Sequence, residues 1–307
     1  MVYNRVQQQQ QKNKSRIDPR IMTAQLAALG FCGADDSVNP RLIALLAHNY
    51  PLVEWGILFR PDKEGLPRYA TLDWVRRLSS ILNIDGGNSR TRKVRLAAHL
   101  CGSHVNDLLT SSTRSSSAEA IDGFLAQLYQ WGFRRVQVNA TAVNGVYTDN
   151  LAHESTIRSF LRTVSCHRNL EFIVQKNEET EPLWSGLLGE EMQENVVFLH
   201  DESKGTGKVA SGGWCEDGRF VSTSRRIVGF AGGIKPSNVQ SAIQNAIEAS
   251  NKSGAKEFWI DMESGVRTKL LPSEMEGKDD VFDLAKCYEC IDIVCGLGLM
   301  SHPPDLR

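Results

Sequence analysis

The chain has 307 residues, with 35 Lys and Arg residues against 36 Asp and Glu residues, so its formal net charge at pH 7 is -1. This balance disfavours a protein that binds nucleic acid or a membrane surface, because both activities depend on clustered positive charge. The hydrophobic fraction of 41% excludes disorder over most of the length and supplies enough apolar side chains for a sizeable core.

The first residues, MVYNRVQQQQQKNKSRIDPR, are polar and rich in glutamine, with no apolar segment. We expect a disordered tail over residues 1–20 rather than a secretory signal or a membrane anchor, with a transit peptide as the alternative. One domain is expected over residues 21–300, followed by a short tail over 301–307. Seven cysteines fit neither a disulfide framework nor paired zinc-binding spacing, and they favour a reducing, cytoplasmic location.

Eight short apolar runs recur along the chain, each followed by Gly, Asn, Asp or Ser. Several are apolar at nearly every position, which is typical of a parallel sheet that is buried on both faces. The runs predict strands at residues 24–31, 52–59, 94–101, 134–140, 170–176, 195–201, 225–231 and 257–263.

Amphipathic patterns with apolar residues at i, i+3 and i+4 lie between these runs. They predict helices at residues 40–48, 71–82, 118–132, 154–164, 236–249 and 280–294. Eight strand–helix units predict a (β/α)8 TIM barrel of the ribulose-phosphate-binding type. An open doubly wound sheet is disfavoured, because GFCGADD lacks the GxGxxG loop that usually follows its first strand.

In a barrel the active site lies at the carboxyl ends of the strands, and phosphate commonly binds after the seventh and eighth strands. The seventh predicted strand leads into GFAGGIKPSNV, where two glycines precede a proline near a helix start, and the eighth leads into ESGV. Free backbone N–H groups in such turns can bind anions. We therefore expect phosphate at Gly232, Gly233, Ser264 and Gly265; tight turns without a ligand are the alternative.

The third predicted strand ends in HLCGSHV, which brings His99, Cys101 and His104 close in sequence. Strand alternation places His99 and Cys101 on one face, and these side chains suit zinc. An HxCxxH run is no established zinc signature, however, so we expect no metal here and a substrate contact from His99.

Asn139 ends the fourth strand and is expected to contact substrate as well. Asp35 and Asp36 are interpreted as loop or cap residues, with acid–base catalysis as the alternative.

Four segments in order along the chain resemble phosphoribosylanthranilate isomerase, a barrel of the tryptophan pathway, from about residue 29 to 295. WGILFRPDKEGLPRYAT resembles the family's GFIF…SPRYVS, and FLHDESKGTGK resembles its LLDS…GGTGK. GFAGGIKPSNV resembles SGGLNPENV, and FWIDMESGVR with EGKDDVFDLAKCYECI resembles DVSSGVE…PGVKD.

The resemblance implies an Amadori rearrangement by general acid–base catalysis, with no cofactor. By the same resemblance, Cys32 is the catalytic base and Asp201 the catalytic acid, and Arg68 contacts the substrate's carboxylate. The alternatives are a buried packing role for Cys32 and a cap or loop role for Asp201. The thiol would need a lowered pKa and the carboxyl a raised one. The loop GTGK is not a P-loop, and it would offer Lys204 or Lys208 to the substrate, with a solvated surface turn as the alternative.

Several segments depart from that family. Gly30 stands where the family has lysine, the fourth strand continues as QVNATAVNG instead of LHG, and the family has no counterpart of the histidines near Cys101. The sequence therefore predicts a sugar-phosphate isomerase that binds a small phosphorylated substrate as a monomer or homodimer. The alternatives are a lyase or epimerase on the same barrel, and a barrel that binds a phosphorylated metabolite without turning it over.

Overall fold

The eight strands β1–β8 close into one parallel barrel. The computed structural model describes residues 24–84, 94–110, 116–188, 190, 193–201, 203, 214, 227–270 and 280–304. The strands are β1 (Gln25–Cys32), β2 (Val53–Phe59), β3 (Arg95–Leu100), β4 (Arg135–Val138), β5 (Glu171–Lys176), β6 (Val196–Asp201), β7 (Ile227–Ala231) and β8 (Glu257–Met262). Each strand pairs in parallel with the next, and β8 closes the ring on β1. The predicted (β/α)8 TIM barrel is therefore confirmed.

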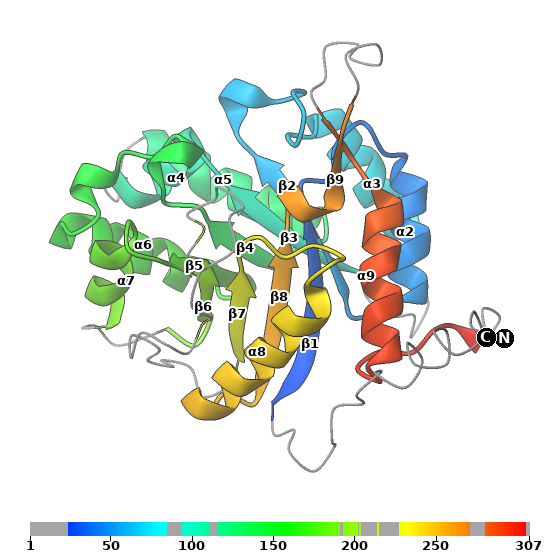
Figure 1. Ribbon diagram of the computed structural model, residues 1–307. Helices are drawn as coiled ribbons and strands as arrows, with labels where there is room; N and C mark the ends of the chain where they lie inside the picture. Colours follow the sequence, from blue (N-terminus) through cyan, green and yellow to red (C-terminus); the bar gives the residue numbers. More distant parts are fainter. Residues whose placement is uncertain are drawn as a thin grey trace, which may run out of the picture.

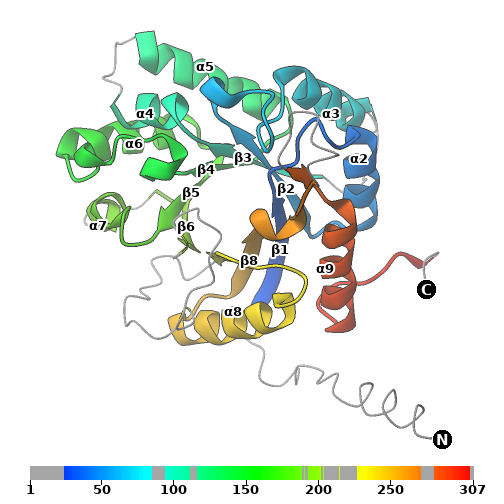
Figure 2. The ribbon, with the colours of Figure 1, turned by 45° about the horizontal axis from the view of Figure 1, so that its top comes forward.

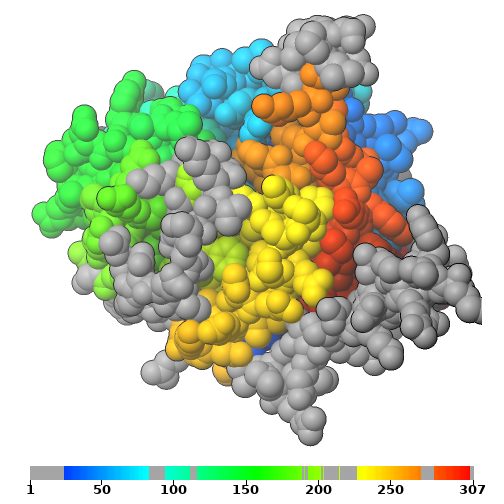
Figure 3. Space-filling view, in the orientation of Figure 1, coloured from blue at the N-terminus to red at the C-terminus, as the bar shows by residue number. Residues whose placement is uncertain are grey.

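The helices surround the strands, as Figures 1 and 2 show. They are α2 (Pro40–Asn49), α3 (Leu72–Ile84), α4 (Ser103–Thr110), α5 (Ser116–Gln130), α6 (Glu154–Cys166), α7 (Glu181–Leu188), α8 (Val239–Ser253) and α9 (Leu284–Gly296). The last two lie side by side on one face of the molecule (Figures 1 and 3). No helix of the described ranges is long and apolar enough to cross a membrane.

One expected helix is shorter than the sequence pattern indicates. The pattern predicts a helix from residue 280, but Asp280–Phe282 forms β10, which pairs antiparallel with β9 (Arg267–Lys269). The helix α9 begins only after Asp283, whose side chain accepts hydrogen bonds from two backbone N–H groups of the first turn. Thus Asp283 is an N-cap, and the residues before it extend the loop that follows β8.

Large apolar side chains on the outer face of the barrel pack under the helices. Phe31, Trp55, Phe172, Phe230 and Phe258 are almost fully buried there. A second, smaller apolar cluster lies inside the barrel, and it contains Ile173, Val197, Leu199, Ile227 and Trp259 among others. This burial on both faces explains why the strands are apolar at nearly every position.

An ion cluster lies near the amino ends of the strands, inside the barrel. Arg135 donates to Glu54 at 2.7 Å and to Glu171 at 2.8 Å, and its guanidinium lies 4.2 Å from the ring centroid of Trp259. Glycine at position 229 leaves space for the indole of Trp259, because a Cβ there would be 2.2 Å from the ring. The barrel is therefore closed at this end by one arginine, two carboxylates and a tryptophan.

We predict that Arg135→Met destabilises the protein by about 3–5 kcal/mol, because it leaves two carboxylates in the barrel without their cation. Urea unfolding monitored by circular dichroism measures the change. The matched control is Arg158→Met, whose side chain is 73% exposed and pairs with Glu154 on α6; it should cost no more than about 1 kcal/mol. Equal losses in the two variants would contradict this account of the ion cluster.

Candidate active site

A polar pocket opens at the carboxyl ends of the strands. This is the end of a TIM barrel at which catalytic residues are found. Its walls come from strands β3 to β8 and the loops that follow them. The lining residues are His99, Gln137, Asn139, Asn144, Gln175, Leu199, Asp201, Ser203, Ala231, Gly232, Gly233, Ile234, Asp261, Met262, Glu263, Ser264 and Gly265.

Side-chain amides form one wall of the pocket. Gln137 Nε2 donates to Asn139 Oδ1 at 2.7 Å, and Asn139 Nδ2 lies 3.3 Å from the sulfur of Cys101. The acceptor atoms Gln137 Oε1 and Gln175 Oε1 are buried, and neither has a hydrogen-bond partner among the residues that the structure describes. Unpaired buried acceptors are costly, so these two atoms are suited to accept hydrogen bonds from a ligand's hydroxyl groups.

Asp201 ends β6 and faces the pocket, as the sequence predicts. Its carboxylate accepts hydrogen bonds from the backbone N–H and hydroxyl of Ser203, at 3.1 and 2.5 Å, and from Gln175 Nε2 at 3.2 Å. The preceding residue, His200, stacks on Phe230 instead, with ring centroids 5.8 Å apart. The two side chains thus lie on opposite faces of the strand, as expected from strand alternation.

Glu263 brings a second carboxyl group to the pocket, one residue after β8. Burial raises its pKa above the ordinary value, and the neighbouring Arg68 offsets part of this effect. Arg68 Nη1 donates to Glu263 Oε1 at 2.7 Å, which fixes the carboxyl group at the pocket edge. A carboxyl group with a raised pKa can hold a proton near neutral pH and donate it to a reacting atom.

Arg68 belongs to an ion-pair network with Arg267. Its Nη2 donates to Asp280 Oδ2 at 2.9 Å, and its backbone N–H donates to Asp35 at 2.6 Å. Arg267 in turn donates to Asp35 at 2.8 Å and to Asp280 at 2.8 Å. Arg68 also has a φ of 79°, the only positive φ at a residue other than glycine in the described ranges. Its guanidinium is thus held by Glu263 and Asp280.

Asp35 therefore lies in this network and not in the pocket lining. Burial alone would raise its pKa, but the hydroxyl of Ser37 and the charge of Arg267 outweigh burial and lower it. Its neighbour Asp36 accepts hydrogen bonds from the backbone N–H and hydroxyl of Thr71, both at 2.7 Å. Both acids have the structural role that the sequence favours.

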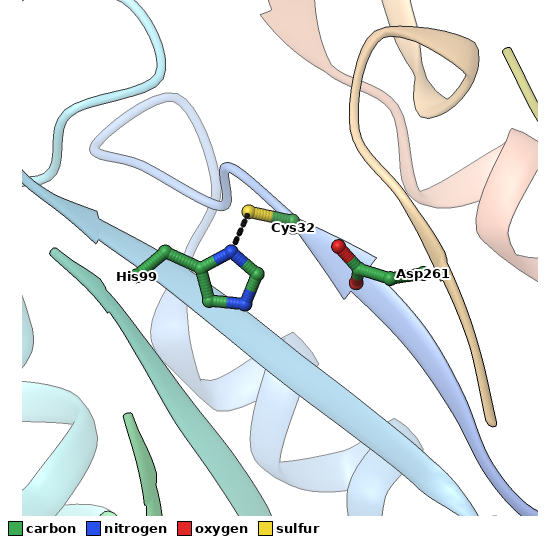
Figure 4. Close-up of side chains that lie close together, drawn as sticks. All are labelled: Cys32, His99 and Asp261. Atoms are coloured by element: carbon green, nitrogen blue, oxygen red, sulfur yellow. Dashed lines mark hydrogen bonds between the residues drawn. The ribbon is translucent and has the colours of Figure 1, made fainter. Parts of the chain in front are cut away.

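Cys32, His99 and Asp261 come together from β1, β3 and β8 (Figure 4). Cys32 Sγ lies 3.1 Å from His99 Nδ1. Burial, followed by the charges of Asp261 and Glu263, raises the pKa of the Cys32 thiol well above its ordinary value. Burial also lowers the pKa of His99 to about 3, so the imidazole is neutral. These surroundings disfavour the free thiolate that the predicted role of Cys32 requires.

The histidines near Cys101 do not form one group. Cys101 lies beside Cys32 inside the barrel, whereas His104 is on α4 and stacks on Phe124 with ring centroids 4.2 Å apart. The alternative of zinc held by His99, Cys101 and His104 is therefore wrong, because a helix carries His104 away from the strand end. His99 itself lines the pocket, as does Asn139.

The predicted phosphate-binding loops meet at the pocket edge. Gly232 and Gly233 have φ angles of 104° and 65°, which only glycine adopts readily. A Cβ at Gly265 would lie 1.9 Å from the carbonyl oxygen of Ile234, so the loops after β7 and β8 pack backbone against backbone. Ser264 Oγ lies 3.2 Å from Arg68 Nη1. Lys204 and Lys208 lie outside the described residues.

Sequence analysis assigned no role to several polar residues of the pocket, among them Gln137, Gln175, Asp261 and Glu263. Gln137 and Asp261 lie two residues before Asn139 and Glu263, so strand alternation points both into the barrel. This spacing was the available signal. What sequence cannot show is which inward side chains meet across the barrel, because that depends on how the strands are staggered.

No protein-family model matches the chain, and no curated protein matches its sequence. Among solved structures, D-allulose 3-epimerase from Methylomonas sp. matches with a TM-score of 0.51 and 10% identity, over 90% of this chain and 99% of that chain. An L-ribulose 3-epimerase matches with a TM-score of 0.46 and 11% identity, over 89% and 95%. At such low identity the first match supports the barrel fold alone.

The resemblance to phosphoribosylanthranilate isomerase is wrong. No family model matches the chain, and a solved structure that it matches with a TM-score of 0.51 is a D-allulose 3-epimerase. The geometry also opposes the roles that the resemblance gives to Cys32 and Arg68. The Cys32 thiol is buried beside carboxyl groups, which disfavours a thiolate, and the Arg68 guanidinium is already paired with Glu263 and Asp280. Of the motifs that carried the resemblance, GFAGG and ESGV lie at the ends of β7 and β8, where turns of this kind are common in barrels.

We predict that Asp35→Asn destabilises the protein at pH 7 by about 3 kcal/mol, because Arg267 is buried and loses one of its two carboxylates. The folded-state pKa of Asp35 is lowered, so its stabilising effect is present above the ordinary value of 3.8 and is lost as pH falls toward the folded value. Unfolding free energies of the two proteins should therefore differ at pH 7 and converge in acid. A difference that is independent of pH would contradict this prediction.

Proposed function

We propose that the protein is a sugar epimerase that acts on a small ketose by general acid–base catalysis. The observation that carries the proposal is that two carboxyl groups from different strands, Asp201 and Glu263, line one pocket whose wall is rich in amides. Carboxyl groups exchange protons with carbon next to a carbonyl group, and amides form hydrogen bonds with hydroxyl groups.

In the proposed reaction one carboxylate removes a proton from the carbon beside the carbonyl group, which leaves an enediolate. The other carboxyl group then returns a proton to the opposite face of the same carbon, which inverts its configuration. Asp201 is assigned as the base because Ser203 N–H, Ser203 Oγ and Gln175 Nε2 all donate hydrogen bonds to its carboxylate, and such bonds favour the ionised form of a carboxyl group. Glu263 is assigned as the acid because burial raises its pKa.

The pocket surface agrees with a polyhydroxylated substrate. Gln137 and Gln175 each present a buried carbonyl oxygen that has no partner in the described ranges, and Asn139 and Asn144 lie beside them. A site built to form hydrogen bonds with hydroxyl groups discriminates strongly against analogues that lack them. D-allulose 3-epimerase, whose fold this chain shares, is named for a reaction of this class.

We further propose that the substrate carries a phosphate group, which would bind where the loops after β7 and β8 meet at Gly232, Gly233, Ser264 and Gly265. Their position matches the phosphate site common to barrels. Three carboxyl groups line the same pocket, and a Cβ at Gly232 would be only 3.2 Å from Asp201 Oδ1. Charge repulsion therefore favours the side of the loops near Ser264, whose hydroxyl lies 3.2 Å from Arg68 Nη1. This geometry orients the substrate with its reacting carbon toward the strands.

Asp201→Asn and Glu263→Gln should each lower kcat by about 10²- to 10⁴-fold, the usual contribution of a positioned acid or base. The assay is incorporation of solvent deuterium into a panel of ketoses and ketose phosphates, followed by NMR. Deuterium at a carbon whose configuration inverts indicates epimerisation, whereas an aldose product with deuterium at C2 indicates isomerisation.

The control for both variants is Glu154→Gln, because Glu154 is exposed on α6 and lies outside the pocket. It should keep wild-type activity. Wild-type protein that binds a sugar phosphate but exchanges no deuterium with any member of the panel would contradict catalysis and favour a barrel that binds metabolites. Carbon–carbon cleavage would favour a lyase.

Ser264→Asp should raise KM for a phosphorylated ketose by at least about tenfold, because a carboxylate at this loop repels the phosphate. The KM for the same ketose without phosphate should change little. Steady-state kinetics with the two substrates separate these effects. Equal changes in both KM values would contradict a phosphate site at this loop, while leaving the proton-transfer assignment intact.

A further inference from the structure

Three side chains of different chemistry converge inside the barrel at the base of the pocket. Cys32, His99 and Asp261 each offer one ligand atom, and these three atoms all lie within 4.8 Å of one another (Figure 4). They come from β1, β3 and β8, so the closed barrel, and no local sequence motif, brings them together.

The distances suit a small metal ion. With Zn–S near 2.3 Å and Zn–N near 2.0 Å, sulfur and nitrogen ligands of a tetrahedral zinc ion lie about 3.5 Å apart. Cys32 Sγ and His99 Nδ1 are 3.1 Å apart, and the carboxylate of Asp261 lies within the 4.8 Å limit. Only small side-chain movements are needed to surround an ion.

The donor set also narrows the choice of metal. Thiolate and imidazole ligands favour zinc and other late first-row metals, whereas magnesium and calcium prefer oxygen ligands alone. His99 is buried inside the barrel, and its Nδ1 faces the sulfur of Cys32 at 3.1 Å.

Two strand glycines keep space around the three side chains. A Cβ at Gly30 would lie 2.5 Å from Asp261 Oδ1, and a Cβ at Gly56 would lie 2.8 Å from His99 Nε2 and 3.0 Å from Cys32 Cβ. Glycine weakens a strand interior and often marks a place that a ligand approaches closely. Both glycines therefore leave space for Cys32, His99 and Asp261, although glycine lowers the stability of the strands that contain it.

The carboxylate of Asp261 is the second indication of a ligand. Within the part of the chain that the structure describes, it forms no hydrogen bond and no ion pair, although it lies inside the barrel. The charge of Arg135 acts on Asp261, but that guanidinium is already paired with Glu54 and Glu171. A carboxylate in such surroundings is stabilised when it binds a cation.

We propose that Cys32, His99 and Asp261 form a zinc site with three protein ligands and a fourth position open to the pocket. His99 and Asp261 both line the pocket, so a water molecule or a substrate oxygen would reach the ion. Three protein ligands with one open position are typical of catalytic rather than structural zinc. The proposal concerns metal binding and does not depend on the reaction proposed above.

The test is titration of the full-length protein, stripped with a chelator and kept reduced, with Co²⁺ and then Zn²⁺. We expect one ion per chain, a near-ultraviolet band from thiolate-to-cobalt charge transfer, and a rise in melting temperature with Zn²⁺. Cys32→Ser should abolish the charge-transfer band, and His99→Gln and Asp261→Asn should each weaken binding by at least about tenfold.

Two matched cysteine variants serve as controls. Cys101→Ser removes the neighbouring buried thiol, and Cys166→Ser removes an exposed one; both should keep the stoichiometry and the band. Circular dichroism spectra check that each variant is folded. Gly56→Ala, which leaves all three ligands in place but fills the space beside His99, should also weaken binding.

Wild-type protein that binds no cobalt, or a charge-transfer band that persists in folded Cys32→Ser, would overturn the proposal. A band that disappears in Cys166→Ser would assign the metal to the surface thiol and would overturn it as well. None of these outcomes bears on turnover, so a failed metal site and a failed epimerase assignment are distinguishable.

Discussion

Two arginines shared among three carboxylates position the part of the barrel on which the candidate site depends. Arg267 joins Asp35, from the loop after β1, to Asp280, from the loop after β8. Arg68 joins Asp280 to Glu263 at the pocket edge. Because every carboxyl group of the network pairs with an arginine at 2.7–2.9 Å, the geometry of these groups is fixed. The position of Glu263 in the pocket is therefore set by contacts outside the pocket.

The interior of the barrel changes in polarity along its axis. At the amino ends of the strands, Arg135 and its two carboxylates close the barrel over Trp259. An apolar cluster that contains Ile173 and Val197 follows, and the amides and carboxyl groups of the pocket lie beyond it. The interior of most TIM barrels is dominated by branched aliphatic residues. Here the apolar layer separates an ion cluster with a structural role from polar groups that face the pocket.

The sequence predicted the barrel and all eight strands to within about two residues, since buried parallel strands have a simple apolar pattern. It placed Asp201, His99 and Asn139 in the pocket because strand ends face the same opening. It did not predict that Cys32 and Asp261 would lie beside His99, since contacts across a barrel depend on strand stagger. The apolar pattern before Asp283 suited both a helix and β10, and the pairing of β10 with β9 decided between them.

The backbone conformation of Arg68 limits which residues this position can hold without altering the pocket. A φ of 79° is strained for arginine and comfortable for glycine, so Arg68→Gly would relax the loop while removing the guanidinium that holds Glu263 and Asp280. At Arg68, an unstrained backbone and a fixed position of the Glu263 carboxyl group are therefore incompatible. Arg68→Gly therefore has two opposing effects on stability, relief of backbone strain and loss of two ion pairs, and the second also loosens the pocket.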